Sequence, residues 1–210
     1  MFYIDIVILT KSSKQKGFCV AGINLLTHEW VRLVSPSQEH DGALSINELC
    51  LPNGYILQPL DIARVPILKY YPQGCQSENY LIASETPWEY LGKMALSDVI
   101  KKSNVLHPPL IFGNKYKYIK SDMIDMFNRS LLLTEVTDLK IYRKEGTTVR
   151  HKCEFKHNGN LYEEISMTDP DYYRYNTYDI KKAYIVVSLP HKDFPEGRYY
   201  KFVAKIFPCR

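Results

Sequence analysis

The sequence predicts a mostly β protein with minor α content, built as two successive small barrels joined by a helical and basic segment. Its 17 tyrosines, 8 phenylalanines and 2 tryptophans make 13% of the residues aromatic, and aromatic side chains favour half-buried strands. Short runs in which apolar and polar residues alternate fall into two groups along the chain. A chain of 210 residues can bury one large core or two small ones. Its composition, 45% hydrophobic and 24% charged, excludes collagen, coiled coils and extensive disorder.

The first group of alternating runs predicts four strands. They are expected at residues 2–9, 18–26, 30–34 and 61–71. Turn residues separate the early runs, at Gln15-Lys16-Gly17 and Thr27-His28-Glu29. Hairpins should therefore join these strands.

The middle of the chain is predicted to be partly helical and basic. The expected helices cover residues 45–51, a Trp88/Leu91/Ala95 face, and residues 97–102 and 121–127. Between Val99 and Ser121 the chain has five lysines, no acidic residue and a His107-Pro108-Pro109 break. This composition is typical of an irregular basic connector or of a solvated linker face. The expected organisation is a first module at 1–104, a basic connector at 105–130 and a second module at 131–210.

The second group predicts five strands, at residues 131–142, 149–156, 161–167, 183–189 and 198–207. Turn residues lie between them at Glu145-Gly146, Asn158-Gly159 and Pro195-Glu196-Gly197, and Asn158-Gly159 is the strongest hairpin signal. About five short strands in each group, with a helix between, is what an OB-fold predicts. A β-sandwich is the alternative that periodicity alone leaves open.

Two strands of the second module are expected to show a basic outer face. Arg150 and Lys152 alternate with Cys153 and its apolar neighbours, and Tyr199 and Lys201 alternate with Tyr200 and Phe202. Cations neutralise phosphates and aromatic rings stack on bases, so such a face suits single-stranded nucleic acid. The alternative is an ordinary soluble β surface on which lysines protect an edge strand from pairing.

The first module offers two further candidate binding groups. Residues 11–17 are expected to form a loop in which Lys11, Ser12, Lys14 and Lys16 could grip a phosphate. Trp30 and Arg32 share one strand face and could stack on and clamp a ligand. The alternative is that Trp30 packs in the core and Arg32 forms an internal ion pair.

Catalysis and metal binding have little support in the sequence. The six histidines lack zinc-site spacing, and no P-loop or dinucleotide loop is present. Asp169-Pro170-Asp171 is interpreted as a structural turn whose aspartates bind local backbone N–H groups. Asp138, Glu154 and Lys156 are only a faint match to a metal-dependent nuclease. We therefore expect no catalytic residue, metal or cofactor.

The net charge and the cysteines indicate which partners and which cellular compartment to expect. The net charge is +4 and the isoelectric point is about 8.6, which permits a nucleic-acid partner without demanding one. Residues 35–98 carry a net charge of −5, whereas residues 99–210 carry +7. Five widely spread cysteines, no signal-peptide pattern and no long apolar run predict a cytoplasmic protein without a membrane partner.

Several short motifs, taken in order, resemble the bacterial dual OB-containing domain family. They are the segments Leu9–Lys14, Gly17–Gly22, Glu29–Ser35, Asp61–Pro66, Gln76–Tyr80, Met167–Pro170, Val187–Leu189 and Tyr199–Ile206. The resemblance implies two OB barrels and nucleic-acid binding. It implies no enzymatic activity that the whole family shares. The polar positions that it marks are Lys11, Ser12, Lys14, Trp30, Arg32, Gln76, Glu78, Asn79, Asp169 and Lys201. Ser77 and Tyr80 depart from the family pattern, where relatives tend to have a proline and a tryptophan, but a tyrosine ring can still stack on a base.

Three functions follow from these observations. The first is a sensor or accessory module that binds single-stranded DNA or RNA without its own catalysis. Its candidate contacts are Lys11, Ser12, Lys14, Lys16, Trp30, Arg32, Gln76, Asn79, Tyr80, Arg150, Lys152, Tyr199 and Lys201. The second is a protein-interaction scaffold whose partner binds the acidic region 35–98. The third is a metal-dependent nuclease or nucleotide-binding enzyme.

Overall fold

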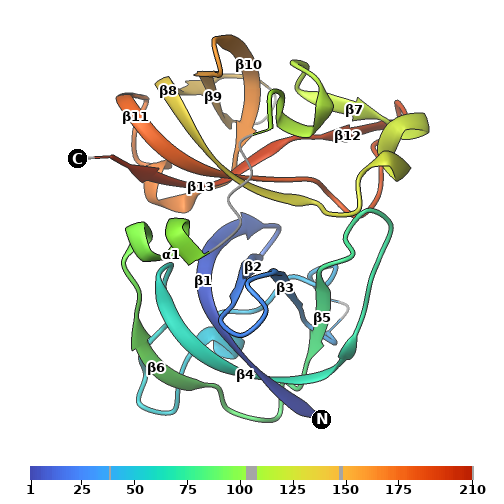
Figure 1. Cartoon of the computed structure of the whole chain (residues 1–210), viewed down its shortest axis with the longest axis vertical. Helices are drawn as coiled ribbons and strands as arrows, with labels where there is room; N and C mark the ends of the chain where they lie inside the picture. The colour runs from blue at the N-terminus through green and yellow to red at the C-terminus, as the bar shows by residue number, and fades with distance from the viewer. Residues whose placement is uncertain (38, 103–107, 147–148, 210) are drawn as a thin grey trace. The chain divides into compact units, whose positions relative to one another are not determined.

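The chain forms two compact units. A computed structural model describes residues 1–37, 39–102, 108–146 and 149–209 (Figure 1). Unit 1 comprises Met1–Gln73 and Ser77–Val105, and unit 2 comprises Gly74–Gln76 and Leu106–Arg210. The described residues of the segment expected as a connector therefore belong to unit 2.

Unit 1 is a closed ring of five strands with a sixth strand added. Its strands are β1 (Phe2–Lys14), β2 (Gly17–Asn24), β3 (Trp30–Val34), β4 (Asp61–Tyr70), β5 (Asn79–Ile82) and β6 (Glu89–Lys93). The sheet order is β1-β2-β3-β5-β4-β6, and an additional β1–β4 pairing closes the ring. Only the β3–β5 pair of this ring is parallel.

Unit 2 repeats this topology. Its strands are β7 (Tyr118–Lys120), β8 (Leu131–Lys144), β9 (Arg150–His157), β10 (Asn160–Met167), β11 (Thr177–Ser188), β12 (Arg198–Tyr200) and β13 (Phe202–Pro208). The barrel closes in the order β10-β13-β11-β8-β9, with β10 and β13 parallel, while β7 and β12 form a separate two-stranded sheet. In both rings the third and fifth strands pair in parallel, so the two OB-like barrels are confirmed and the sandwich alternative is wrong.

Each barrel surrounds its own core because inward residues alternate with outward ones. In unit 1, Ile4, Ile6 and Ile8 of β1 contribute successive inward side chains. In unit 2, Phe155 of β9 stacks on Tyr162 of β10, with ring centroids 5.3 Å apart. The predicted Asn158-Gly159 hairpin is confirmed, since both residues have the positive φ angles, 47° and 74°, that a type I′ turn needs.

Helices are short and few. They are η1 (Asn47–Leu49), α1 (Leu96–Lys102), η2 (Ile111–Gly113), η3 (Ser121–Met126) and η4 (Pro170–Tyr172), of which only α1 is an α-helix. The helix expected at 97–102 is confirmed. The expected Trp88/Leu91/Ala95 face is wrong, because residues 89–93 instead pair with β4 as strand β6. Within the described ranges, no helix is long and apolar enough to cross a membrane.

The segment expected as a loop at residues 11–17 is mostly strand. β1 continues to Lys14 and pairs with β2 up to Gly17, so only Gln15 and Lys16 form the turn. Gln15 accommodates that tight turn with a φ of 52°. The prediction of a loop is therefore wrong at Lys11, Ser12 and Lys14, which are strand residues.

Candidate nucleic-acid interface

The outer face of β9 carries alternate basic side chains. Arg150 and Lys156 are exposed and Lys152 is half-buried, whereas Cys153 and Phe155 lie in the core of unit 2. This alternation is the one predicted from the sequence, and the outward direction of these cations is confirmed.

Neighbouring strands extend this surface on both sides of β9. Tyr142 and Lys144 of β8 lie opposite Lys152 and Arg150, respectively. Ser166 of β10 lies opposite Lys152 on the other side, and Lys152 Nζ donates a hydrogen bond to Ser166 Oγ at 2.8 Å. We call this surface the basic face; it consists of Lys140, Tyr142, Lys144, Arg150, Lys152, Glu154, Lys156, Glu164 and Ser166.

Two bulges determine which side chains reach the basic face. The β8–β9 register shifts around Asp138 and the β9–β10 register shifts around Glu164, and both residues have positive φ angles, 51° and 57°. A bulge inserts an extra residue and re-aims the side chains that follow it. Leu139 and Ile141 consequently stay in the core, so Tyr142, which follows Ile141, points outward.

Like charges gather on the basic face. Burial lowers the pKa of the Lys152 ammonium, and the nearby cations Lys117, Arg150 and Lys144 lower it further, although Glu164 acts in the opposite direction. Hydrogen bonds from Lys144 and Tyr142 lower the pKa of the Glu164 carboxyl. An anion that binds this surface therefore lowers the electrostatic free energy of the clustered cations.

A row of aromatic rings lies on the β7–β12 sheet and the turn before it. Tyr116 stacks on Tyr118 with centroids 6.2 Å apart, Tyr118 contacts Tyr200 at 5.9 Å, and Tyr200 contacts Phe194 at 5.0 Å. The Arg198 guanidinium lies 4.3 Å from the Tyr118 centroid. We call these four rings the aromatic row. Tyr116, at its end, is 69% exposed and presents a ring face for stacking.

The aromatic row adjoins the basic face. Ser166 pairs with Lys152 on one side and with Phe202 on the other, and Tyr200 is two residues before Phe202. Lys117, between two rings of the row in sequence, is close enough to influence the Lys152 ammonium. The aromatic row and the basic face are therefore linked within unit 2 through Lys117 and Ser166.

The family model for the dual OB-containing domain matches residues 4–206, which include nearly all of both barrels. The chain belongs to the dual OB-containing domain family. Comparison with curated proteins and comparison with solved structures each found no match. The two five-stranded rings are the two OB barrels of this dual OB-containing domain.

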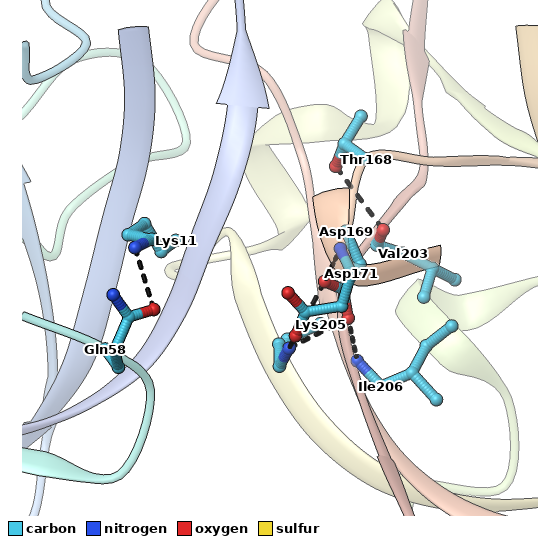
Figure 2. Close-up of polar contacts among 8 residues, drawn as sticks. All are labelled: Lys11, Gln58, Thr168, Asp169, Asp171, Val203, Lys205 and Ile206. Atoms are coloured by element: carbon cyan, nitrogen blue, oxygen red, sulfur yellow. Dashed lines mark hydrogen bonds and ion pairs between the residues drawn. The ribbon is translucent and has the colours of Figure 1, made fainter. Parts of the chain in front are cut away.

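The predicted cations of β1 in the dual OB-containing domain are held by internal partners. Lys11 Nζ donates to Gln58 Oε1 at 2.8 Å (Figure 2) and lies 5.6 Å from the Phe18 ring centroid. Lys14 forms a 3.0 Å ion pair with Asp41. Ser12 is buried, and Lys16 at the turn is exposed. Of the four, Lys16 extends furthest into solvent.

Other predicted residues of the first module are buried or partly buried. Arg32 is 6% exposed and pairs with Glu78 at 3.5 Å, so the internal ion pair considered as an alternative is confirmed. Asn79 is fully buried, and Gln76 in unit 2 donates to the Leu189 carbonyl at 2.9 Å. The two aromatic residues predicted to stack on bases in this module, Trp30 and Tyr80, are half-buried. The Tyr80 ring contacts the Tyr70 ring.

The structure contradicts the predicted outward direction of Lys201. Its side chain is 1% exposed, and Nζ donates to Ile111 O at 2.6 Å, Asn114 O at 2.8 Å and Asn114 Oδ1 at 2.9 Å. Burial lowers the pKa of Lys201 to about 7. The alternation failed because the expected single strand breaks at Lys201 into β12 and β13. Tyr199 is partly buried and packs against the core.

Asp169 is fully buried and extends the contact between β10 and β13 that closes the unit 2 barrel (Figure 2). β10 pairs with β13 at only two positions, and beyond them Asp169 Oδ2 accepts the Ile206 N–H at 2.9 Å. Asp169 Oδ1 accepts from the Asp171 N–H and from Lys205 Nζ, both at 3.2 Å, and Lys205 also pairs with Asp171. The predicted structural turn is confirmed, and its lysine partner Lys205 is buried.

The acids proposed for a nuclease are bound to lysines. Asp138 pairs with Lys156 at 3.0 Å, and Glu154 lies 3.9 Å from Lys140. In the part of the chain that the structure describes, no three His, Cys, Asp or Glu side chains gather as metal ligands do.

None of the four rings of the aromatic row was predicted as a binding residue, and part of the basic face was also missed. The missed residues are Tyr116, Lys117, Tyr118, Tyr142, Lys144, Glu164, Phe194, Arg198 and Tyr200. A signal was present for two of these rings, because Tyr116 and Tyr118 alternate with lysines in the basic segment. No spacing pattern could bring them beside Tyr200 and Phe194, which lie far along the chain.

Proposed function

We propose that this dual OB-containing domain binds single-stranded nucleic acid through unit 2, as a sensor or accessory module without catalysis of its own. The observation that carries the proposal is the placement of the basic face on β9 and β10. These are the second and third strands of the unit 2 ring, and OB-folds bind oligonucleotides on the face of those strands.

The two parts of the interface have separate tasks. Arg150 and Lys152 contact phosphates and supply affinity that does not depend on sequence. The aromatic row stacks on bases, which contributes about 1–3 kcal/mol per stacked base. Duplex DNA keeps its bases stacked on one another, so the row favours single strands.

The scaffold alternative is weaker because much of the acidic charge in region 35–98 is used internally. Glu78 pairs with Arg32, Asp41 with Lys14, and Asp61 is fully buried. Glu48 accepts hydrogen bonds from three serine hydroxyls, and Glu89 lies 3.5 Å from Arg64. Among the described contacts, Glu39, Glu48, Glu85 and Asp98 have no cationic partner, so about half of the eight acids in this region are paired with a cation.

Fluorescence anisotropy of labelled 20-nucleotide DNA and RNA strands tests the proposal, with a duplex as the control. Binding at low salt should weaken as salt rises, with a log-log slope of about −0.7 per phosphate contact. Arg150→Glu should weaken binding and reduce this slope. Lys16→Glu makes the same change in charge sign at an exposed turn of unit 1 and serves as the matched control.

Two results would contradict the proposal. One is the absence of binding to any single strand at low salt. The other is an equal loss of affinity in Arg150→Glu and Lys16→Glu, because that would reflect net charge rather than a site on unit 2.

A further inference from the structure

Glu164 is the carboxylate of the basic face that lies beside Lys144 and Lys152, whereas Glu154 lies opposite Lys140. Its Oε1 accepts a hydrogen bond from the Tyr142 hydroxyl at 2.8 Å, and its Oε2 lies 2.6 Å from Lys144 Nζ. Lys152 Nζ reaches the Glu164 carbonyl oxygen at 3.4 Å. One acidic side chain thus engages donors on β8 and faces a cation of β9.

These donors suit a phosphate as well as they suit a carboxylate. A hydroxyl and two ammonium groups offer hydrogen bonds and positive charge to an anionic oxygen, and most protein contacts to nucleic-acid backbones are of this kind. Glu164 supplies the same acceptor chemistry from within the chain.

The backbone directs Glu164 into this position. The β9–β10 register shifts between Tyr162 and Ile165, and Glu164 has a φ of 57°. For a residue other than glycine this left-handed conformation is unfavourable, so the surrounding strands hold it in place. Bulges of this kind re-aim side chains, and here the side chain crosses β9 to reach Tyr142 and Lys144.

We propose that Tyr142, Lys144 and Lys152 form a phosphate subsite that Glu164 occupies until a nucleic-acid phosphate displaces it. This inference rests on the proposed function and names the ligand of one part of that surface. When no ligand is bound, Glu164 neutralises the positive charge of the subsite. An anion must displace Glu164 to bind, so the subsite has low affinity for anions that make few other contacts with the protein. The hydrogen bonds that lower the pKa of Glu164 keep this carboxylate charged and competitive near neutral pH.

The test compares Glu164→Gln with Glu163→Gln. Both substitutions remove one negative charge from adjacent positions of β10, so their long-range effects on an anionic ligand are matched. Only Glu164→Gln releases Lys144. Exposed ion pairs contribute at most about 1 kcal/mol, so single-strand affinity should rise about two- to fivefold more in Glu164→Gln than in Glu163→Gln. This extra gain should disappear when Lys144→Ala is also present.

A second probe separates this inference from the proposed function. Inorganic pyrophosphate, titrated by NMR, should perturb the amides of residues 142–144 and 152 at lower concentration in Glu164→Gln than in Glu163→Gln. Equal behaviour of the two variants with both probes would overturn the subsite. A preference of Glu164→Gln for pyrophosphate, with no variant binding a single strand, would support the subsite and reject the proposed function.

Discussion

Replacing Lys201 with methionine should remove a pH dependence from the stability of unit 2. Burial lowers the pKa of Lys201 from 10.5 to about 7 in the folded protein. Between these two values the unfolded chain holds a proton on Lys201 that the folded chain has lost. The free energy of unfolding therefore rises with pH in this window, because the unfolded state binds more protons. Methionine has a similar length but does not titrate.

The size of the effect follows from the two pKa values. A shift of one pKa unit corresponds to 1.36 kcal/mol. The range from pH 6.5 to 8.5 lies mostly between the folded and the unfolded pKa of Lys201, so the contribution of Lys201 to the free energy of unfolding changes across most of it. Over these two units the free energy of unfolding should rise by about 2 kcal/mol more in the natural protein than in Lys201→Met. Other titrating groups are common to both proteins and cancel in the difference.

Urea unfolding followed by far-UV circular dichroism measures this difference. Both tryptophans, Trp30 and Trp88, lie in unit 1, so their fluorescence reports that unit separately. Lys201 Nζ has three acceptors, which matches the three hydrogens of an ammonium. A stability difference that stays constant from pH 6.5 to 8.5 would show that these acceptors keep Lys201 charged, and it would refute the argument from burial.

Three further outcomes are expected. Asp169→Ala should destabilise unit 2 by about 3–5 kcal/mol in urea unfolding, because it removes a fully buried carboxylate that accepts hydrogen bonds from Lys205 and from the Ile206 N–H. Asp171→Ala, at a largely exposed position, should cost less than about 1 kcal/mol, and equal losses would contradict the closing role of Asp169. Burial acts to raise the pKa of Glu48, but hydrogen bonds from Ser84, Ser35 and Ser45 outweigh it and lower the pKa below 4.5. Acid titration should therefore destabilise the natural protein relative to Glu48→Gln as pH falls below about 4.5, and parallel curves would reject this. Tyr118→Leu should weaken single-strand binding by about 1–3 kcal/mol without changing the salt slope, with Tyr90→Leu in unit 1 as the control; a changed slope would assign Tyr118 to phosphate contacts.

The alternation of side chains predicted the strands well wherever one face of a strand meets the core. β9 shows this clearly, because Cys153 and Phe155 are buried and Arg150 and Lys156 are exposed. The Asn158-Gly159 turn was equally predictable, since its residues tolerate the positive φ angles required. Local periodicity and turn chemistry thus predicted most of the fold and one strand of the candidate interface.

The errors come from partners that are distant in sequence. Lys201 is buried because its acceptors at Asn114 lie 87 residues earlier in the chain. Arg32 is buried beside Glu78, 46 residues away. A two-residue period predicts outward positions but cannot show that another segment covers them, and bulges such as the one at Glu164 change the period without a sequence signal.

The order of strands in each ring has a consequence for synthesis. In unit 2 the strand β13 lies between β10 and β11, although it is the last of the five to be made. Until residues 202–208 leave the ribosome, β10 and β11 each present an unpaired edge, and such edges recruit other chains. β5 holds the same position in unit 1, between β3 and β4. Neither ring can close before its last strand, of 7 residues in unit 2 and 4 residues in unit 1, has been made. The edges that this strand covers stay open until then.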